Sequence, residues 1–228
     1  MTTEELASRL ETIRSRIAEA ADAVGRDAAK VTLVAAAKAQ PVQAMRDAIA
    51  LGVTAVGHNY VQELRSARAS LGASAARWHF IGTLQSSTAH QVADLADVVE
   101  TLAGERAIRR LAGRAARAGR TVDGFLEVDF TGGRRSGYAP DEVMAAADVV
   151  SAIDGLRLRG LMTIPPPTPT AEEARPWFRR LRELRDQVAE RHDEVLDLSM
   201  GMSLDYQVAV HEGATMVRIG TALFGPRT

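Results

Sequence analysis

The sequence contains no cysteine among its 228 residues, so disulfide bonds and thiolate metal sites are excluded. Lysine is nearly absent as well, because Lys30 and Lys38 are the only two in the chain. No stretch approaches the roughly 18 consecutive apolar residues that a membrane-spanning helix requires. The first twenty residues are charged throughout, unlike a secretory signal peptide. These absences predict a cytoplasmic protein with no membrane partner.

Charge of one sign is not in excess either, since 28 basic and 29 acidic residues give a net charge of −1. That balance does not indicate a nucleic-acid partner. Aromatic residues are few, at 4%, whereas hydrophobic residues make up 46% and charged residues 25%, as in an ordinary globular protein. Walker, GxGxxG and HExxH motifs are missing, so neither a nucleotide site nor a metal site is expected.

Short apolar runs alternate with helical patterns along the whole chain. Eight strands are expected, at 31–38, 54–57, 78–82, 97–101, 122–130, 156–164, 194–200 and 214–220. Helices are expected between them, at 41–51, 59–70, 86–96, 104–118, 140–152, 171–191 and 204–211. This alternation is typical of a parallel sheet in an α/β protein. Eight βα units predict a single (β/α)8 TIM barrel spanning 1–228, with an open doubly wound sheet as the alternative.

An extra helix is expected before the first strand. Its apolar residues recur at three- and four-residue steps on one face: Leu6, Leu10, Ile13, Ile17 and Val24. Thr2 and Glu5 have the spacing of a capping box at its start, and Gly25 is a stop signal. The same reasoning makes Asn59 and Ser203 candidate N-caps of later helices.

Lys38 directly follows the apolar run of the first strand, so a barrel would place it at the mouth where active sites lie. Apolar flanks desolvate the amine and favour its neutral form, which a lysine that captures a carbonyl group needs. An exposed lysine that begins a loop is the alternative. Lys30, the other lysine, is expected at the opposite end of the same strand.

Two loops near the C-terminal end offer candidate anion sites. SMGMS (199–203) precedes a helix, and VRIGTALFG (217–225) contains Gly220 and Thr221 at the start of a helical turn. Main-chain amides at such turns bind anions, and barrels often bind phosphate after strands seven and eight. Arg218 lies beside them and can contact either a phosphate or a ring nitrogen. Simple capping explains either loop by itself.

Other polar residues favour structural interpretations. His58 and His79 lie among apolar residues, as core histidines do. The loop 131–137 carries Arg134 and Arg135, which either meet an anion at the rim or remain solvated. The acidic residues are expected mostly on the exposed faces of helices.

Six segments together resemble the pyridoxal phosphate homeostasis protein family, whose barrel is shared with the N-terminal domain of alanine racemase. They are VAAAKAQP around Lys38, GHNYVQE (57–63), WHFIGTLQS (78–86), LRGLMTIP (158–165), LSMGMSLD (198–205) and EGATMVRIGTALFG (212–225). The resemblance implies a fold-type III barrel that binds pyridoxal 5′-phosphate (PLP), a vitamin B6 cofactor.

The resemblance also implies a set of cofactor-binding residues. Lys38 would form the Schiff base, and Arg218 would face the pyridine nitrogen, where a cation disfavours ring protonation and weakens the electron sink. The full set comprises Lys38, Asn59, Ser199, Met200, Gly201, Arg218, Gly220 and Thr221. The sequence departs from the family at two positions of the rim: His58 stands where the family has glutamate, and Thr83 where it has histidine.

Three functions remain open from the sequence. The favoured one is a monomeric, non-catalytic carrier or buffer of PLP in vitamin B6 and amino-acid homeostasis, with no residue assigned to catalysis. Alanine racemases add a C-terminal β domain, which this chain is expected to lack. The second is a racemase-like enzyme of low activity that takes a base from His58, His79 or Tyr60. The third is an interaction module with a vestigial PLP site.

Overall fold

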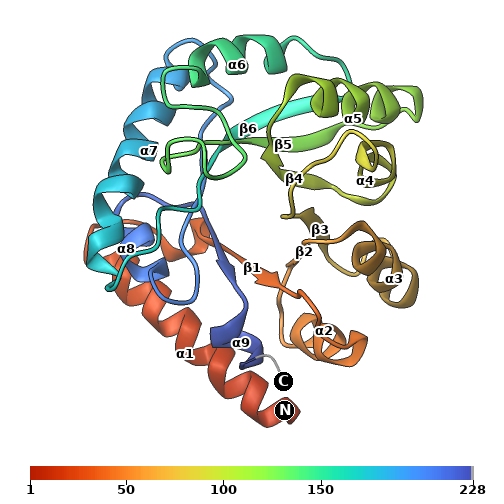
Figure 1. Ribbon diagram of the computed structural model, residues 1–228. Coiled ribbons are helices and arrows are strands. Elements are labelled where there is room, and N and C mark those ends of the chain that lie inside the picture. The colour runs from red at the N-terminus through yellow and green to blue at the C-terminus, as the bar shows by residue number, and fades with distance from the viewer. Residues whose placement is uncertain (227–228) are drawn as a thin grey trace.

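The computed structural model describes residues 1–226 as a closed barrel of eight parallel strands in chain order (Figure 1). The last two residues of the predicted domain, 227–228, lie outside the described part. The strands are β1 (Thr32–Ala36), β2 (Ala55–His58), β3 (Arg77–Phe80), β4 (Val98–Leu102), β5 (Val122–Glu127), β6 (Leu156–Met162), β7 (Asp197–Ser199) and β8 (Met216–Ile219).

A helix follows each strand, one further helix precedes β1, and together they surround the barrel (Figure 1). They are α1 (Thr3–Asp22), α2 (Val42–Ala50), α3 (Val61–Leu71), α4 (Ala89–Leu95), α5 (Glu105–Arg117), α6 (Val143–Ser151), α7 (Arg175–Ala189), α8 (Tyr206–His211) and α9 (Thr221–Phe224). Two 3₁₀ turns, η1 (Ala28–Lys30) and η2 (Glu172–Ala174), precede β1 and α7. Each expected strand and helix overlaps an observed one.

The predicted barrel is confirmed, and the open sheet is wrong. β1 pairs with β2 along one edge, where Val34 is opposite Ala55, and with β8 along the other, where Val34 is opposite Arg218. Closure therefore leaves neither β1 nor β8 as an edge strand. It also brings the loops after β7 and β8 close to the end of β1.

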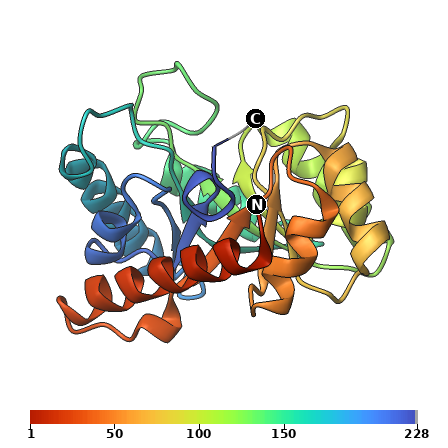
Figure 2. The ribbon, with the colours of Figure 1, turned by 90° about the horizontal axis from the view of Figure 1, so that it is seen from below.

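Helix α1 lies across the outside of the barrel, against α8, α9 and α2 (Figure 2). Its predicted capping box is present, because the Thr2 side chain and Glu5 each bond the other's main-chain N–H. Leu6, Leu10 and Ile13 are buried as expected, which stabilises the fold by about 1.5–3 kcal/mol for each side chain. The expectation for Val24 is wrong: the helix ends at Asp22, and Val24 is exposed.

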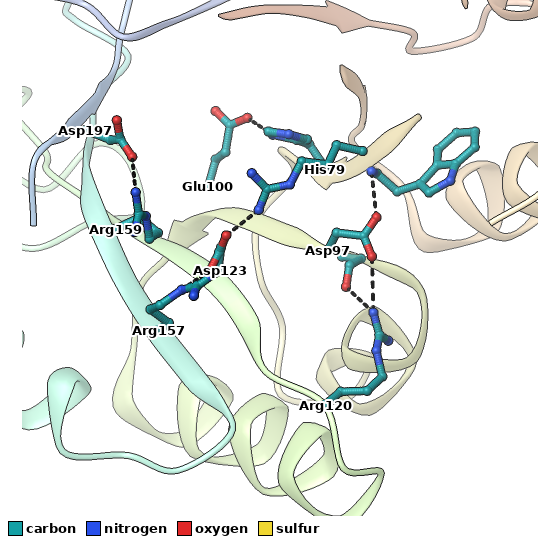
Figure 3. A network of polar contacts seen from close by, with 11 residues as sticks. His79, Asp97, Glu100, Arg120, Asp123, Arg157, Arg159 and Asp197 are labelled. Carbon is teal, nitrogen blue, oxygen red and sulfur yellow. Dashed lines mark hydrogen bonds and ion pairs between the residues drawn. The ribbon is translucent and has the colours of Figure 1, made fainter. Parts of the chain in front are cut away.

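The barrel interior is filled in layers, because every second residue of a strand points inward. One apolar layer consists of Val34, Ala55, Val98, Phe125, Met162 and Met216. Towards the amino ends of the strands, Asp123 pairs with Arg77 and Arg157, and Asp197 with Arg159. Towards the carboxyl ends, two residues beyond Val98, Glu100 bonds His79 (Figure 3). The apolar layer therefore separates two polar clusters.

The loops that follow the strands gather at the mouth of the barrel. In Figure 2 the long green loop after β5 and the teal loop after β6 rise from the same side of the molecule. Within residues 1–226, no helix is both long and apolar enough to cross a membrane. The cytoplasmic location stays a prediction.

Candidate functional site

A cavity of about 400 Å³ opens at the mouth of the barrel, between β1, β2 and the loops after β6, β7 and β8. Its size lies within the usual range for small-molecule sites, roughly 300–1,000 Å³. The wall combines aliphatic side chains with an amine, a guanidinium, two amides and two hydroxyl groups. It consists of Ala36, Lys38, Gln40, Asn59, Ile81, Ile164, Met202, Ser203, Leu204, Arg218, Gly220, Thr221 and Gly225.

Lys38 enters this cavity because of its position along β1. Val34 belongs to the interior apolar layer, Ala36 is two residues further on and lines the cavity, and Lys38 is two further again. The Lys38 Nζ lies 5.4 Å from the centroid of the Tyr60 ring, within the range of a cation–π contact. The structure thus brings the expected amine to the mouth.

Ala39, directly after Lys38, holds the chain in an unusual backbone conformation. Its φ is 58°, and no other non-glycine residue among 1–226 has a positive φ. Such a conformation costs an alanine about 1 kcal/mol. Strain of this kind is often stored at functional sites. Here it turns the chain out of the barrel immediately after the lysine.

Ala39→Gly is expected to stabilise the protein, because glycine adopts a positive φ without a steric cost. The gain should be about 0.5–1 kcal/mol, or roughly 2–3 °C in melting temperature. The matched control is Ala37→Gly, which removes a fully buried methyl group on the other side of Lys38 and should lower the melting temperature. A lower melting temperature for Ala39→Gly as well would refute the assignment of strain to Ala39.

The loops after β7 and β8 are tied together beside the cavity. The Ala222 N–H, in the first turn of α9, donates to the Ser203 Oγ at 3.1 Å. Gly220 and Thr221 begin that turn, as expected. The prediction that Ser203 caps its own helix is wrong, because α8 begins after Asp205 and the Ser203 hydroxyl serves α9 instead. The two candidate anion loops are therefore in direct contact.

The eight candidate residues divide into two groups. Five of them line the cavity together: Lys38, Asn59, Arg218, Gly220 and Thr221. Ser199, Met200 and Gly201 do not, and their loop contributes Met202, Ser203 and Leu204 instead. Met200 is fully buried in the larger hydrophobic core, which is separate from the apolar layer inside the barrel. Gly201 has a φ of 91° and a Cβ there would lie 2.5 Å from the Ala209 Cβ, so this glycine is required for packing.

Arg218 joins the cavity to a buried hydrogen-bond chain. Its Nη2 donates to the Thr163 carbonyl oxygen at 2.8 Å, and its Nη1 donates to the Ser199 Oγ. Burial lowers the pKa of Arg218, and the charge of Glu100, 3.7 Å away, opposes that shift. An arginine remains charged under either influence. The cavity therefore has a fixed positive charge in its wall.

The polar groups of β2 and β3 have different roles. The Asn59 Nδ2 donates to the Ile81 carbonyl oxygen at 3.4 Å, and Asn59 does not cap α3. His58 is buried, stacks on Trp78, and has a pKa lowered to about 4 by burial. Outside the cavity wall, the His79 Nδ1 lies 2.6 Å from the Glu100 Oε1. Both histidines are core residues, as the sequence suggested.

The sequence reasoning missed the acidic residues inside the barrel. Glu100, Asp123 and Glu127 lie within the expected strands 97–101 and 122–130 and are buried, and the expectation that acidic groups lie mostly on helical faces did not single them out. A signal was available: each lies two residues from an interior apolar residue, Val98 or Phe125. Alternation along a strand therefore places them inside.

Glu127, at the end of β5, is a buried carboxyl group with a raised pKa. Burial raises its pKa to about 7, although the charges of Arg218 and Arg135 oppose the shift. Because the unfolded chain has the ordinary value of 4.5, the folded state binds this proton more tightly. Ionisation of Glu127 therefore costs stability as the pH rises from about 4.5 to about 7.

Glu127→Gln is expected to stabilise the protein at pH 8 by up to about 3 kcal/mol and to have little effect near pH 5. Urea unfolding of both proteins at the two pH values measures this difference. Both proteins contain His58, whose lowered pKa makes stability rise with pH, so its contribution cancels when the two proteins are compared. Glu11→Gln, at an exposed position of α1, is the control. If the two proteins differed in unfolding free energy by the same amount at both pH values, Glu127 would not have the raised pKa.

The rim loop 131–137 is held by Asp129. The Asp129 carboxylate accepts hydrogen bonds from the main-chain N–H groups of Thr131 and Gly133, both at 2.7 Å. Arg134 and Arg135 are exposed and do not line the cavity. Residues 1–226 contain no cluster of side chains suited to a metal ion.

Comparisons with known proteins agree with this geometry. Residues 8–228 match the family model described as "Alanine racemase, N-terminal domain". The pyridoxal phosphate homeostasis protein of Pseudomonas aeruginosa is 40% identical over 223 residues, which cover 97% of this chain and 96% of that protein. The chain is a member of the pyridoxal phosphate homeostasis protein family.

Solved structures of other proteins resemble this member of the homeostasis protein family. The structure of PipY from Synechococcus elongatus with PLP bound is similar, with a TM-score of 0.85 and 32% identity, over 96% of this chain and all of that one. An alanine racemase from Clostridium difficile has a TM-score of 0.71 at 13% identity, and this chain covers 56% of it. That likeness concerns the fold alone.

Proposed function

We propose that this chain binds PLP as a Schiff base on Lys38 and acts as a carrier or buffer of the cofactor. The observation that carries the proposal is the convergence of Lys38, Arg218 and Thr221 on one cavity. The family name and the PLP-bound structure of PipY support it. The predicted single domain, 1–228, and the monomeric state belong to the same proposal.

The chemistry of the cavity fits the groups that PLP carries. An amine captures an aldehyde, and a buried guanidinium suits an anion or a ring nitrogen. Hydroxyl groups of Ser203 and Thr221 lie in the wall beside the main chain of Gly220. A Cβ on Gly220 would lie 3.3 Å from the Ala36 carbonyl oxygen, so a bare Cα there preserves the close approach of β8 to β1.

When bound, the cofactor would supply a conjugated ring that absorbs visible light and withdraws electrons. The protein residues would hold it: Lys38 would provide the covalent attachment, and Arg218 would provide a positive charge from the cavity wall. Thr163 and Ser199 restrain the guanidinium group. Ile81 and Ile164 add aliphatic side chains to the cavity wall, against which an apolar ring face would pack.

Borohydride reduction of the purified, PLP-loaded protein, followed by peptide mapping, tests the proposal. The expected adduct lies on the peptide that contains Lys38, with none on the peptide of Lys30. A colourless protein that takes up no added PLP and gives no adduct would refute the proposal. That result would favour an interaction module with a vestigial site.

A racemase-like activity is the second candidate, and Tyr60 is the observation that favours it. None of the three proposed bases lines the cavity, but the Tyr60 ring lies 5.4 Å from the Lys38 Nζ. Loss of optical rotation on incubation with L-alanine or L-serine measures the activity. Robust turnover that disappears in Lys38→Ala would replace the carrier function by an enzymatic one.

A further inference from the structure

A chain of buried hydrogen bonds runs from the cavity wall into the barrel. Arg218 donates to the Ser199 hydroxyl, and that hydroxyl donates to the Glu100 Oε2 at 2.5 Å. The other carboxylate oxygen, Oε1, lies 2.6 Å from the His79 Nδ1. All four side chains are buried, but only Arg218 reaches the cavity. Glu100 therefore touches the site solely through other residues.

Glu100 determines which groups donate and which accept in this series of hydrogen bonds. A serine hydroxyl has one proton, and a carboxylate can only accept. With the proton of Ser199 directed at Glu100, a lone pair of the hydroxyl oxygen remains for Arg218. The second guanidinium nitrogen is held by the Thr163 carbonyl oxygen at 2.8 Å. Two restraints on different nitrogens fix the plane of the guanidinium group.

Glu100 also balances the charge of Arg218. Burial raises the pKa of Glu100, but the hydrogen bond and charge of His79, the charge of Arg218 and the hydrogen bond of Ser199 together hold it below its ordinary value. Glu127 and Asp205 also act on Arg218 electrostatically. Among the described residues, however, Glu100 is the carboxylate that forms an ion pair with it, at 3.7 Å.

We propose that Glu100 is a positioning residue, which acts through Ser199 to fix the orientation and charge environment of Arg218 at the cofactor cavity. The inference rests on the proposed function and adds a role for a residue outside the cavity. Its consequence is that a buried anion on β4 controls how tightly PLP is retained and how its ring is protonated.

The barrel contains its own control for this inference. Asp123 is a second buried carboxylate, paired with Arg157 at 2.7 Å and with Arg77 (Figure 3). It lies on the opposite side of the apolar layer, two residues before Phe125. Glu100→Gln and Asp123→Asn each remove one buried negative charge from the barrel interior. Of the two carboxylates, only Glu100 is connected to the cavity, through Ser199 and Arg218.

The experiment loads full-length wild type, Glu100→Gln and Asp123→Asn with PLP. It then measures retention after extended dialysis, and the pH midpoint of the visible absorbance band. Glu100→Gln is expected to retain PLP about tenfold less tightly and to shift the midpoint by about one pH unit. Asp123→Asn should lower the melting temperature and leave both cofactor readouts unchanged.

Two results would overturn the inference: wild-type retention and midpoint in Glu100→Gln, or equal changes in both variants. If Glu100→Gln does not fold, Ser199→Ala removes the bridging hydroxyl without removing a charge. It should shift the midpoint too, and an unchanged midpoint in that variant also counts against the inference. Failure of the proposed function is distinguishable, because wild type itself would then carry no PLP on Lys38.

Discussion

Lys38→Ala is expected to abolish the yellow colour of the PLP-loaded protein and to lower cofactor retention by at least about tenfold. The reason is that the amine is the one group in the cavity wall able to bond covalently to an aldehyde. Since Lys38 is half-buried at the mouth, its truncation should change the free energy of unfolding by less than about 1 kcal/mol. Absorbance spectra and thermal melting measure the two effects.

Lys30→Ala is the matched control. This lysine ends the 3₁₀ turn η1, at the amino end of β1, and is exposed. A barrel strand separates it from the cavity, so its loss should leave colour and retention unchanged. Persistence of the colour in Lys38→Ala, or its loss in Lys30→Ala, would show that the site is assigned to the wrong lysine.

Gly82→Ala is expected to destabilise the protein by roughly 3 kcal/mol or more. A Cβ at this position would lie 1.9 Å from the Asn59 carbonyl oxygen, which is backbone and cannot rotate away. The conflict would push the end of β2 away from β3, and Asn59 in the cavity wall would move with it. Urea unfolding measures the loss, and PLP retention should fall with it.

Gly113→Ala is the control for that substitution. Gly113 lies within α5, where a Cβ would approach only the flexible Arg117 side chain, at 3.4 Å. Alanine is favoured over glycine in a helix by about 1 kcal/mol, so this variant should be more stable than wild type. A Gly82→Ala protein as stable as Gly113→Ala would mean that the close approach of β2 and β3 is not required.

The order of strands and helices follows from the sequence alone, and so does the placement of Lys38, Gly220 and Thr221 at strand ends. Alternating apolar runs and helical patterns predicted eight βα units, and the apolar run before Lys38 predicted a lysine at the mouth. Gly220 and Thr221 followed from the pattern at the end of the last strand. These features are local in sequence, since a strand end and the turn after it lie within a few residues.

Which side chains lie next to one another depends on how the strands pack in three dimensions. Both faces of a parallel strand are buried, so the apolar pattern does not reveal which side chains point into the barrel. Glu100 lies in an expected strand, 97–101, but its inward direction follows only once Val98 is known to belong to the interior apolar layer. Likewise, residues 199–201 were expected to line the cavity, but in the closed barrel residues 202–204 line it instead. The Ser203 hydroxyl accepts a hydrogen bond from α9. The stagger between neighbouring strands sets these distances, and no local pattern encodes it.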